Sequence, residues 1–167
     1  MTDLIILATL LTGAKHGYSL KRQAGLILGQ ENLHNNLVYP LLRRFVAKKW
    51  VSRQEVPGQR GQRRQLYSLT ARGKKELIMQ LSTFREQDAR DSNEFRLRVG
   101  MFQVIAPEAR LCILDARQAF LRSRLEKLST IEKNFDLDRY AVEVMRRLLA
   151  DSEAEIHWIE HLRRISK

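Results

Sequence analysis

The chain has 167 residues, a formal net charge of +11 at pH 7 and a hydrophobic share of 44%. That share is ordinary for a folded domain, so the positive charge does not indicate disorder, and a single cysteine excludes an internal disulfide framework. The apolar run over residues 4–11 is too short to cross a bilayer, which takes about 20 apolar residues, so we expect a cytoplasmic protein.

The first fifty residues predict three helices, over residues 2–12, 18–28 and about 34–49. Gly13 is placed to end the first helix, and Pro40 lies near the first turn of the third, where a missing N–H costs least. The residues expected to face a core are Leu4, Leu7, Ala8 and Leu11 on the first helix, Leu20, Ala24 and Ile27 on the second, and Val38, Leu41, Leu42 and Phe45 on the third.

The periodicity then changes to that of short strands, over residues 51–56 and 65–69, joined by a basic, glycine-bearing loop at 57–64. Thr70 is a cap for a fourth helix, which we expect to run to Phe84 and couple the two halves of the chain. Three helices, a hairpin and a helix are the element order of a winged helix-turn-helix domain. We therefore predict a mainly α (α+β) protein with a winged helix-turn-helix domain at 1–85.

The second domain, residues 86–167, is predicted to be helical. Residues 86–94 form either a polar break or a weak helix, a short helix follows over 95–105, and Pro107 begins a long one. Apolar residues then recur at steps of three, four and seven, which is typical of helices packed on helices. We predict a dimerisation region whose interface includes Leu114, Leu121, Leu125, Met145, Leu149, Ile156, Trp158 and Ile159.

The positive charge lies wholly in the first part of the chain. Residues 1–75 hold 14 Lys and Arg against 3 Asp and Glu, whereas residues 76–167 hold 16 of each class. This asymmetry is typical of a segment that binds nucleic acid, and Asn, Tyr and Arg on one face of the third helix suit a major groove. The predicted DNA-binding residues are Asn35, Asn36, Tyr39, Arg43, Arg44 and Lys48, with Tyr18 and Lys21 on the second helix and Arg60, Arg63 and Arg64 in the loop.

Other residues in this part of the chain have roles that the sequence leaves open. Lys15, Arg22 and Lys49 are further phosphate neighbours. Tyr18 is either a phosphate contact or a packing residue, and Tyr67 is expected to lie in the core rather than at a contact.

No catalytic group is predicted, and no cofactor or metal. Residues 157–161 match the zinc-peptidase pattern H-x-x-E-H, but only six residues follow and no third ligand is among them. Cys112 reads as a small apolar residue, and Trp158 as part of either a dimer core or a ligand pocket.

Three short motifs, at 16–21 (HGYSLK), 39–44 (YPLLRR) and 66–73 (LYSLTARG), resemble the PadR family of bacterial transcriptional regulators in order and spacing. The resemblance implies a homodimer that places two winged helices on operator DNA and is released by a small aromatic or drug-like effector. Two positions depart from the family pattern: Leu37 replaces a threonine, and Lys49 replaces the glycine that ends the third helix, so this helix is expected to end differently.

Two functions follow from these observations. The first is a DNA-binding regulator, a repressor, which acts as a homodimer on an inverted-repeat operator. The alternative is a winged-helix protein-interaction module without operator-specific DNA binding, because Leu37 cannot donate a hydrogen bond to a phosphate.

Overall fold

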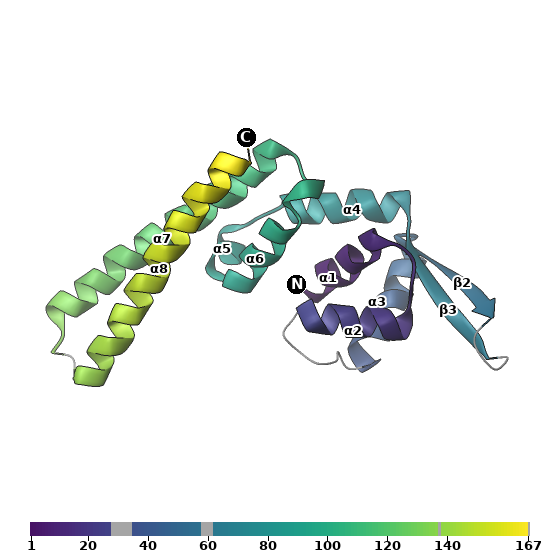
Figure 1. The fold of residues 1–167 in the computed structure, drawn as a ribbon, viewed down its shortest axis with the longest axis horizontal. Helices are drawn as coiled ribbons and strands as arrows, with labels where there is room; N and C mark the ends of the chain where they lie inside the picture. Colours follow the sequence, from purple (N-terminus) through teal and green to yellow (C-terminus); the bar gives the residue numbers. More distant parts are fainter. Residues whose placement is uncertain (28–34, 58–61, 137, 167) are drawn as a thin grey trace. The chain divides into compact units, whose positions relative to one another are not determined.

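The computed structural model describes residues 1–27, 35–57, 62–136 and 138–166, and it divides into two compact units, Met1–Leu81 and Ser82–Lys167. The first unit is a winged helix, as predicted. Its elements are α1 (Thr2–Thr9), a 3₁₀ turn (Leu10–Thr12), β1 (Lys15–His16), α2 (Gly17–Ile27), α3 (Asn35–Ala47), β2 (Val51–Pro57), β3 (Arg63–Leu69) and α4 (Ala71–Ser82), shown in Figure 1.

The hairpin of the first unit is part of a three-stranded antiparallel sheet in the order β1-β3-β2. The sequence pattern does not indicate β1, because two residues are too few to show a strand periodicity. Arg63 and Arg64, predicted in the loop, belong to β3.

Burial differs from prediction in α1 and α2. Ile5 and Ile6, outside the predicted stripe of α1, are as buried as Leu4 and Leu7, because a helix that is apolar all round is buried all round. Ile27 at the end of α2 is 52% exposed rather than buried.

The end of α3 keeps a left-handed residue, so the expectation of a different ending is wrong. Lys49 has φ 59°, the amide of Lys49 donates to the carbonyl of Val46 (2.9 Å), and that of Trp50 donates to the carbonyl of Phe45 (2.9 Å). These two bonds define a Schellman motif. The rings of Phe45 and Trp50, 5.7 Å apart, supply the apolar contact that accompanies it.

This turn packs against the start of α4. Thr70 caps α4 as predicted, since its Oγ1 accepts the amide of Gly73 (3.0 Å), while the Thr70 amide donates to the carbonyl of Trp50 (3.0 Å). The helix ends at Ser82, so the prediction that it reaches Phe84 is wrong. Pro40 lies inside α3, in its second turn, rather than near the first.

The second unit is helical. It contains α5 (Glu86–Arg90), α6 (Ser92–Gly100), a 3₁₀ turn (Phe102–Val104), α7 (Pro107–Asn134) and α8 (Arg139–Ile165). The long helices α7 and α8 lie side by side as an antiparallel hairpin (Figure 1). The polar stretch at 86–94 is helical in two pieces, because Asp91 ends α5 and its carboxylate caps α6 through the amides of Asn93 and Glu94.

Two buried arginines hold the short helices of the second unit. Arg117 of α7 is fully buried and binds Glu155 of α8 through Nε (2.8 Å) and Nη2 (2.9 Å), while it also donates to the carbonyl of Ala89 and the hydroxyl of Ser92. One side chain thus joins α5 and α6 to the α7–α8 hairpin.

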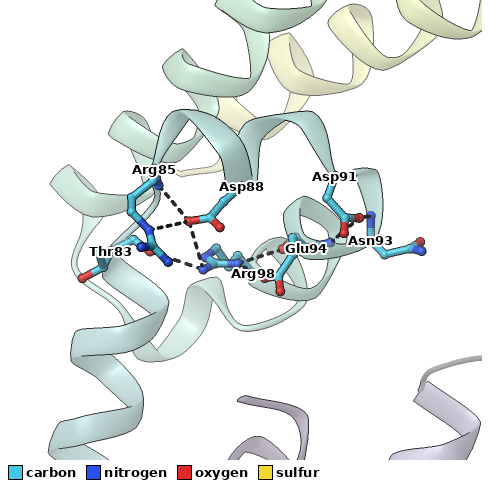
Figure 2. Close-up of polar contacts among 7 residues, drawn as sticks. All are labelled: Thr83, Arg85, Asp88, Asp91, Asn93, Glu94 and Arg98. Carbon is cyan, nitrogen blue, oxygen red and sulfur yellow. Dashed lines mark hydrogen bonds and ion pairs between the residues drawn. The ribbon is translucent and has the colours of Figure 1, made fainter. Parts of the chain in front are cut away.

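The second buried arginine, Arg98 of α6, fixes the segment before α5 (Figure 2). It donates to the carbonyl of Thr83 (3.3 Å) and to the carboxylate of Glu94, and lies 3.9 Å from a carboxylate oxygen of Asp88. The amide of Arg85 donates to the same Asp88 oxygen (2.9 Å), so this segment has a defined conformation.

Within the described residues, no helix is both long and apolar enough to span a bilayer.

Candidate nucleic-acid interface

The helix α3 has one buried and one exposed face. Val38, Leu42 and Phe45 have no exposed surface, while Asn36, Tyr39 and Arg43 are exposed at three- and four-residue spacing. The exposed face therefore carries the amide, hydroxyl and guanidinium groups that sequence analysis assigned to DNA. Asn35 also lies in α3, but its side chain is outside what the structure describes.

The start of α2 meets α3 at Gly17. A Cβ at Gly17 would lie 3.0 Å from the ring carbon Cε1 of Tyr39 and 3.2 Å from its hydroxyl, so the absence of a side chain lets the ring of Tyr39 rest on the backbone of α2.

Beside this contact lies an open groove of about 410 Å³, which we call the α2–β3 groove. Its lining includes His16, Gly17, Tyr18, Tyr39, Arg64 and Tyr67. His16 is fixed at its edge, because its Nδ1 lies 3.2 Å from the carbonyl of Gln65.

Tyr67 is 7% exposed, as the core prediction requires, yet it also lines the groove. Burial raises the pKa of Tyr67 above its ordinary value of 10.0. The charge of Arg53 acts to lower this pKa, Tyr39 acts to raise it, and the charge of Arg43 acts to lower it, each less than burial does. Its hydroxyl is therefore protonated at neutral pH. No sequence motif marks Arg53 as a neighbour of Tyr67, although the strand register places the two directly opposite each other.

Several predicted cations are engaged on the surface of their own chain. Arg44 pairs with Asp3, the Lys48 ammonium lies 4.3 Å from the ring centroid of Trp50, and the Lys21 ammonium lies 5.8 Å from that of Tyr18. Such exposed contacts are weak, so they orient the side chains without removing their charge from the surface. Tyr18 itself is 65% exposed.

The hairpin carries the remaining predicted cations. Arg64 is exposed and forms no ion pair with the described residues, whereas Arg63 pairs with Glu55 at 3.2 Å. Arg60 lies outside the described residues.

The predicted dimer residues fall into two groups. Leu114, Leu121, Met145 and Ile159 are buried within one chain, where α7 packs on α8. They offer a partner no free surface. The members with partly exposed side chains are Leu125, Leu149, Ile156 and Trp158.

The residues weighed for metal or redox chemistry lie on helix surfaces. His157 and His161 are exposed on α8, and no group of three or more His, Cys, Asp or Glu among the described residues could hold a metal ion. Cys112, predicted to pack as an apolar residue, is exposed on α7.

Two family models match the chain. Residues 6–78 match the transcriptional regulator PadR-like family, and residues 92–166 match the model described as virulence activator alpha C-term. No curated protein matches.

Solved structures of regulators are also similar. A candidate transcriptional regulator of Thermoplasma acidophilum is 30% identical over 46% of this chain and 72% of its own (TM-score 0.43). RosR of H. salinarum is 26% identical over 60% of this chain and 86% of its own (TM-score 0.43). PadR of Bacillus subtilis, in complex with operator DNA, is 17% identical over 99% of this chain and 97% of its own (TM-score 0.48).

Proposed function

The chain belongs to the PadR-like family of transcriptional regulators, and we propose that it is a DNA-binding repressor that acts as a homodimer on an inverted-repeat operator. The observation that carries the proposal is the exposed face of α3. It presents Asn36, Tyr39 and Arg43 to solvent in the part of the chain that holds all of the net positive charge.

The chemistry of this face suits base readout. A guanidinium can fork onto guanine and a carboxamide onto adenine, while a tyrosine hydroxyl can bond a phosphate. The surrounding lysines and arginines would supply affinity that does not depend on sequence and that weakens with salt.

A second copy would bind through the α7–α8 hairpin. Its partly exposed apolar side chains, Leu125, Leu149, Ile156 and Trp158, support this assignment. A twofold dimer would present two α3 helices to half-sites about 34 Å apart. Sedimentation of the full chain should report a dimer.

The Arg43→Ala variant tests the role of α3. On an operator selected from genomic fragments with the wild-type protein, the variant should lose about 1–3 kcal/mol of binding free energy and relax the preference at one base position. The matched control is Arg146→Ala, an exposed arginine of α8. Unchanged operator binding by Arg43→Ala in a mobility-shift titration would remove this residue from the interface.

The effector that the family resemblance implies has a candidate site in the second unit. A groove of about 470 Å³ is lined by Trp158 and by Arg96 and Arg124, which form no ion pair with the described residues. We propose that a small aromatic or drug-like molecule binds there and lowers DNA affinity, which requires a higher affinity for the DNA-free state. If no member of a compound panel shifts the melting temperature or releases DNA, this part of the proposal fails.

A protein-interaction module remains the second candidate. Leu37 on α3 is 42% exposed where a hydroxyl residue is common in the family, and an exposed leucine suits a protein surface better than a phosphate. Salt-dependent, sequence-specific DNA binding would exclude this alternative.

A further inference from the structure

Thr83, Phe84 and Arg85 connect α4 to α5, and we call these three residues the joining segment. Each of them is held by the second unit (Figure 2). The guanidinium of Arg98 donates to the carbonyl of Thr83 (3.3 Å), and its carbon lies 5.0 Å from the centroid of the Phe84 ring. The amide of Arg85 donates to the carboxylate of Asp88 (2.9 Å). The joining segment is therefore docked on α5 and α6.

The docked state is incompletely satisfied. Arg98 is only 4% exposed, and its Nε is buried without a hydrogen-bond partner among the described residues. A buried donor without a partner costs free energy, which offsets part of what the other contacts of Arg98 contribute. A small change nearby can therefore release the joining segment, as expected of an element that opens locally while the rest of the fold stays intact.

An aromatic connection leads from the groove at Trp158 to the joining segment. Trp158 lines this groove, and its ring meets that of Phe95 edge-on, with the centroids 5.8 Å apart. Phe95 of α6 has no exposed surface, and its centroid lies 6.5 Å from that of Phe84. Both distances are within the range over which aromatic rings interact. A single buried ring thus separates the groove from the joining segment.

A second connection is polar and runs through Arg117. Ser92 and Glu155 line the groove, and both bind Arg117, Ser92 through its hydroxyl (2.6 Å) and Glu155 through two bonds of 2.8 and 2.9 Å. The same guanidinium donates to the carbonyl of Ala89, the residue after Asp88. Arg117 therefore connects the wall of the groove to α5, and the Asp88 carboxylate of α5 holds the joining segment.

We propose that the joining segment is a reversible coupling element, which Arg98 docks and which a change at the groove releases. The inference rests on the proposed function, because it supplies the route by which a ligand in the groove acts on α4 and the DNA-binding unit. A ligand that displaces Trp158 removes support from Phe95, and one that draws Ser92 away from Arg117 loosens α5. Closely packed side chains transmit such displacements.

Hydrogen exchange of the Arg85 amide measures docking, because this amide is bonded to Asp88 in the docked state. Ser92→Ala and Trp158→Leu change the groove and leave the joining segment itself intact. Each should raise the exchange rate of the Arg85 amide about tenfold in the free protein at constant pH and temperature. Sedimentation should show the wild-type assembly for both variants, so that the change reports docking alone.

Two controls separate docking from general stability. The amide of Leu121, a buried residue of α7, reports opening of the whole second unit and should be accelerated less than that of Arg85. Arg147→Gln is the matched variant, since Arg147 lines the same groove but pairs with Asp151 on its own helix. This variant should exchange at Arg85 as the wild type does.

Arg98→Lys tests the element itself, because lysine keeps the charge and loses the fork of donors. It should accelerate exchange at Arg85, and adding Ser92→Ala or Trp158→Leu should then have little further effect, since coupled changes are not additive. On DNA with two half-sites, Arg98→Lys should bind about tenfold more weakly, whereas its affinity for a single half-site should stay at the wild-type value. A released segment lowers the effective concentration of the second winged helix and leaves the first contact unchanged.

Four results would overturn the inference. They are unchanged Arg85 exchange in both groove variants, equal acceleration of the Arg85 and Leu121 amides, additive effects in the Arg98→Lys background, and wild-type affinity of Arg98→Lys for DNA with two half-sites. Failure of the wild type to bind any DNA at low salt would refute the proposed function instead. The exchange measurements need neither DNA nor a ligand, so they decide the coupling in either case.

Discussion

Gly73 lies in the first turn of α4, and replacement by alanine tests how tightly this turn packs on the end of α3. A Cβ on Gly73 would lie 2.0 Å from the backbone carbonyl oxygen of Trp50 and 2.8 Å from its carbonyl carbon. A backbone atom cannot rotate away as a side chain can, so the turn or the helix has to shift by about 1 Å or more.

Two opposing effects set the sign of the change. Alanine is favoured over glycine inside a helix by about 1 kcal/mol. Against this, overpacking costs about 1–3 kcal/mol. The shift also strains the bonds from the amide and hydroxyl of Thr70 to the Trp50 carbonyl, both 3.0 Å long, each worth about 1 kcal/mol. We therefore expect Gly73→Ala to lower the free energy of unfolding of the first unit by about 2 kcal/mol.

Urea unfolding followed by the fluorescence of Trp50 measures this change. The second tryptophan, Trp158, is replaced by phenylalanine in all proteins compared, so that the signal reports the first unit. Gly100→Ala is the control, because a Cβ at Gly100 of α6, in the second unit, meets nothing within 4 Å; this variant should leave the transition of the first unit unchanged. If Gly73→Ala is as stable as its parent, the close packing inferred at Trp50 does not exist.

Three further predictions concern stability. Lys49→Gly should stabilise the first unit by up to about 1 kcal/mol in the same urea assay, because it relieves a left-handed backbone at a non-glycine residue; a loss of stability would contradict the assigned strain. Arg117→Met should cost about 3 kcal/mol by thermal unfolding, since it leaves the carboxylate of Glu155, whose side chain is only 13% exposed, without its partner. Adding Glu155→Gln should recover part of the loss; additive losses would argue against the pair. Because the folded-state pKa of Tyr67 is raised, folded protein holds this proton to higher pH than unfolded protein, so stability should fall as pH rises above about 10, and less so in Tyr67→Phe; identical pH profiles in urea titrations would refute the burial effect.

Much of the fold followed from local pattern in the sequence. The strand and helix periods, the Thr70 cap and Pro107 at a helix start each act within a few residues, so the order of helices and hairpin and the start of α7 were predictable. The errors came from tertiary context. The spacing of Ile27 places it with Leu20 and Ala24, yet it is 52% exposed among the described residues. Nothing local in residues 82–85 stops a helix that ends at Ser82.

The candidate interface was less accessible to sequence reasoning. The exposed face of α3 has a helical spacing that reveals Asn36, Tyr39 and Arg43. Arg53 and Tyr67 are fourteen positions apart, and only the strand register brings them together. A residue that is largely buried and also lines a groove has no sequence signature either, so the sequence assigns Tyr67 to the core alone.

One backbone carbonyl, that of Trp50, fixes the position of the exposed face of α3 relative to the hairpin. Trp50 ends the turn after α3, leads into β2, and accepts hydrogen bonds from the Thr70 amide and hydroxyl that follow β3. Three elements, α3, the hairpin and α4, thus meet at a joint that tolerates a left-handed Lys49 and has no room for a Cβ at Gly73. A DNA-binding surface composed of α3 and the hairpin needs both to hold a fixed geometry, because phosphate contacts fix register only if they do not move relative to the base-reading helix. Gly73→Ala should therefore weaken DNA binding as well as stability, although Gly73 itself is buried and touches no ligand surface.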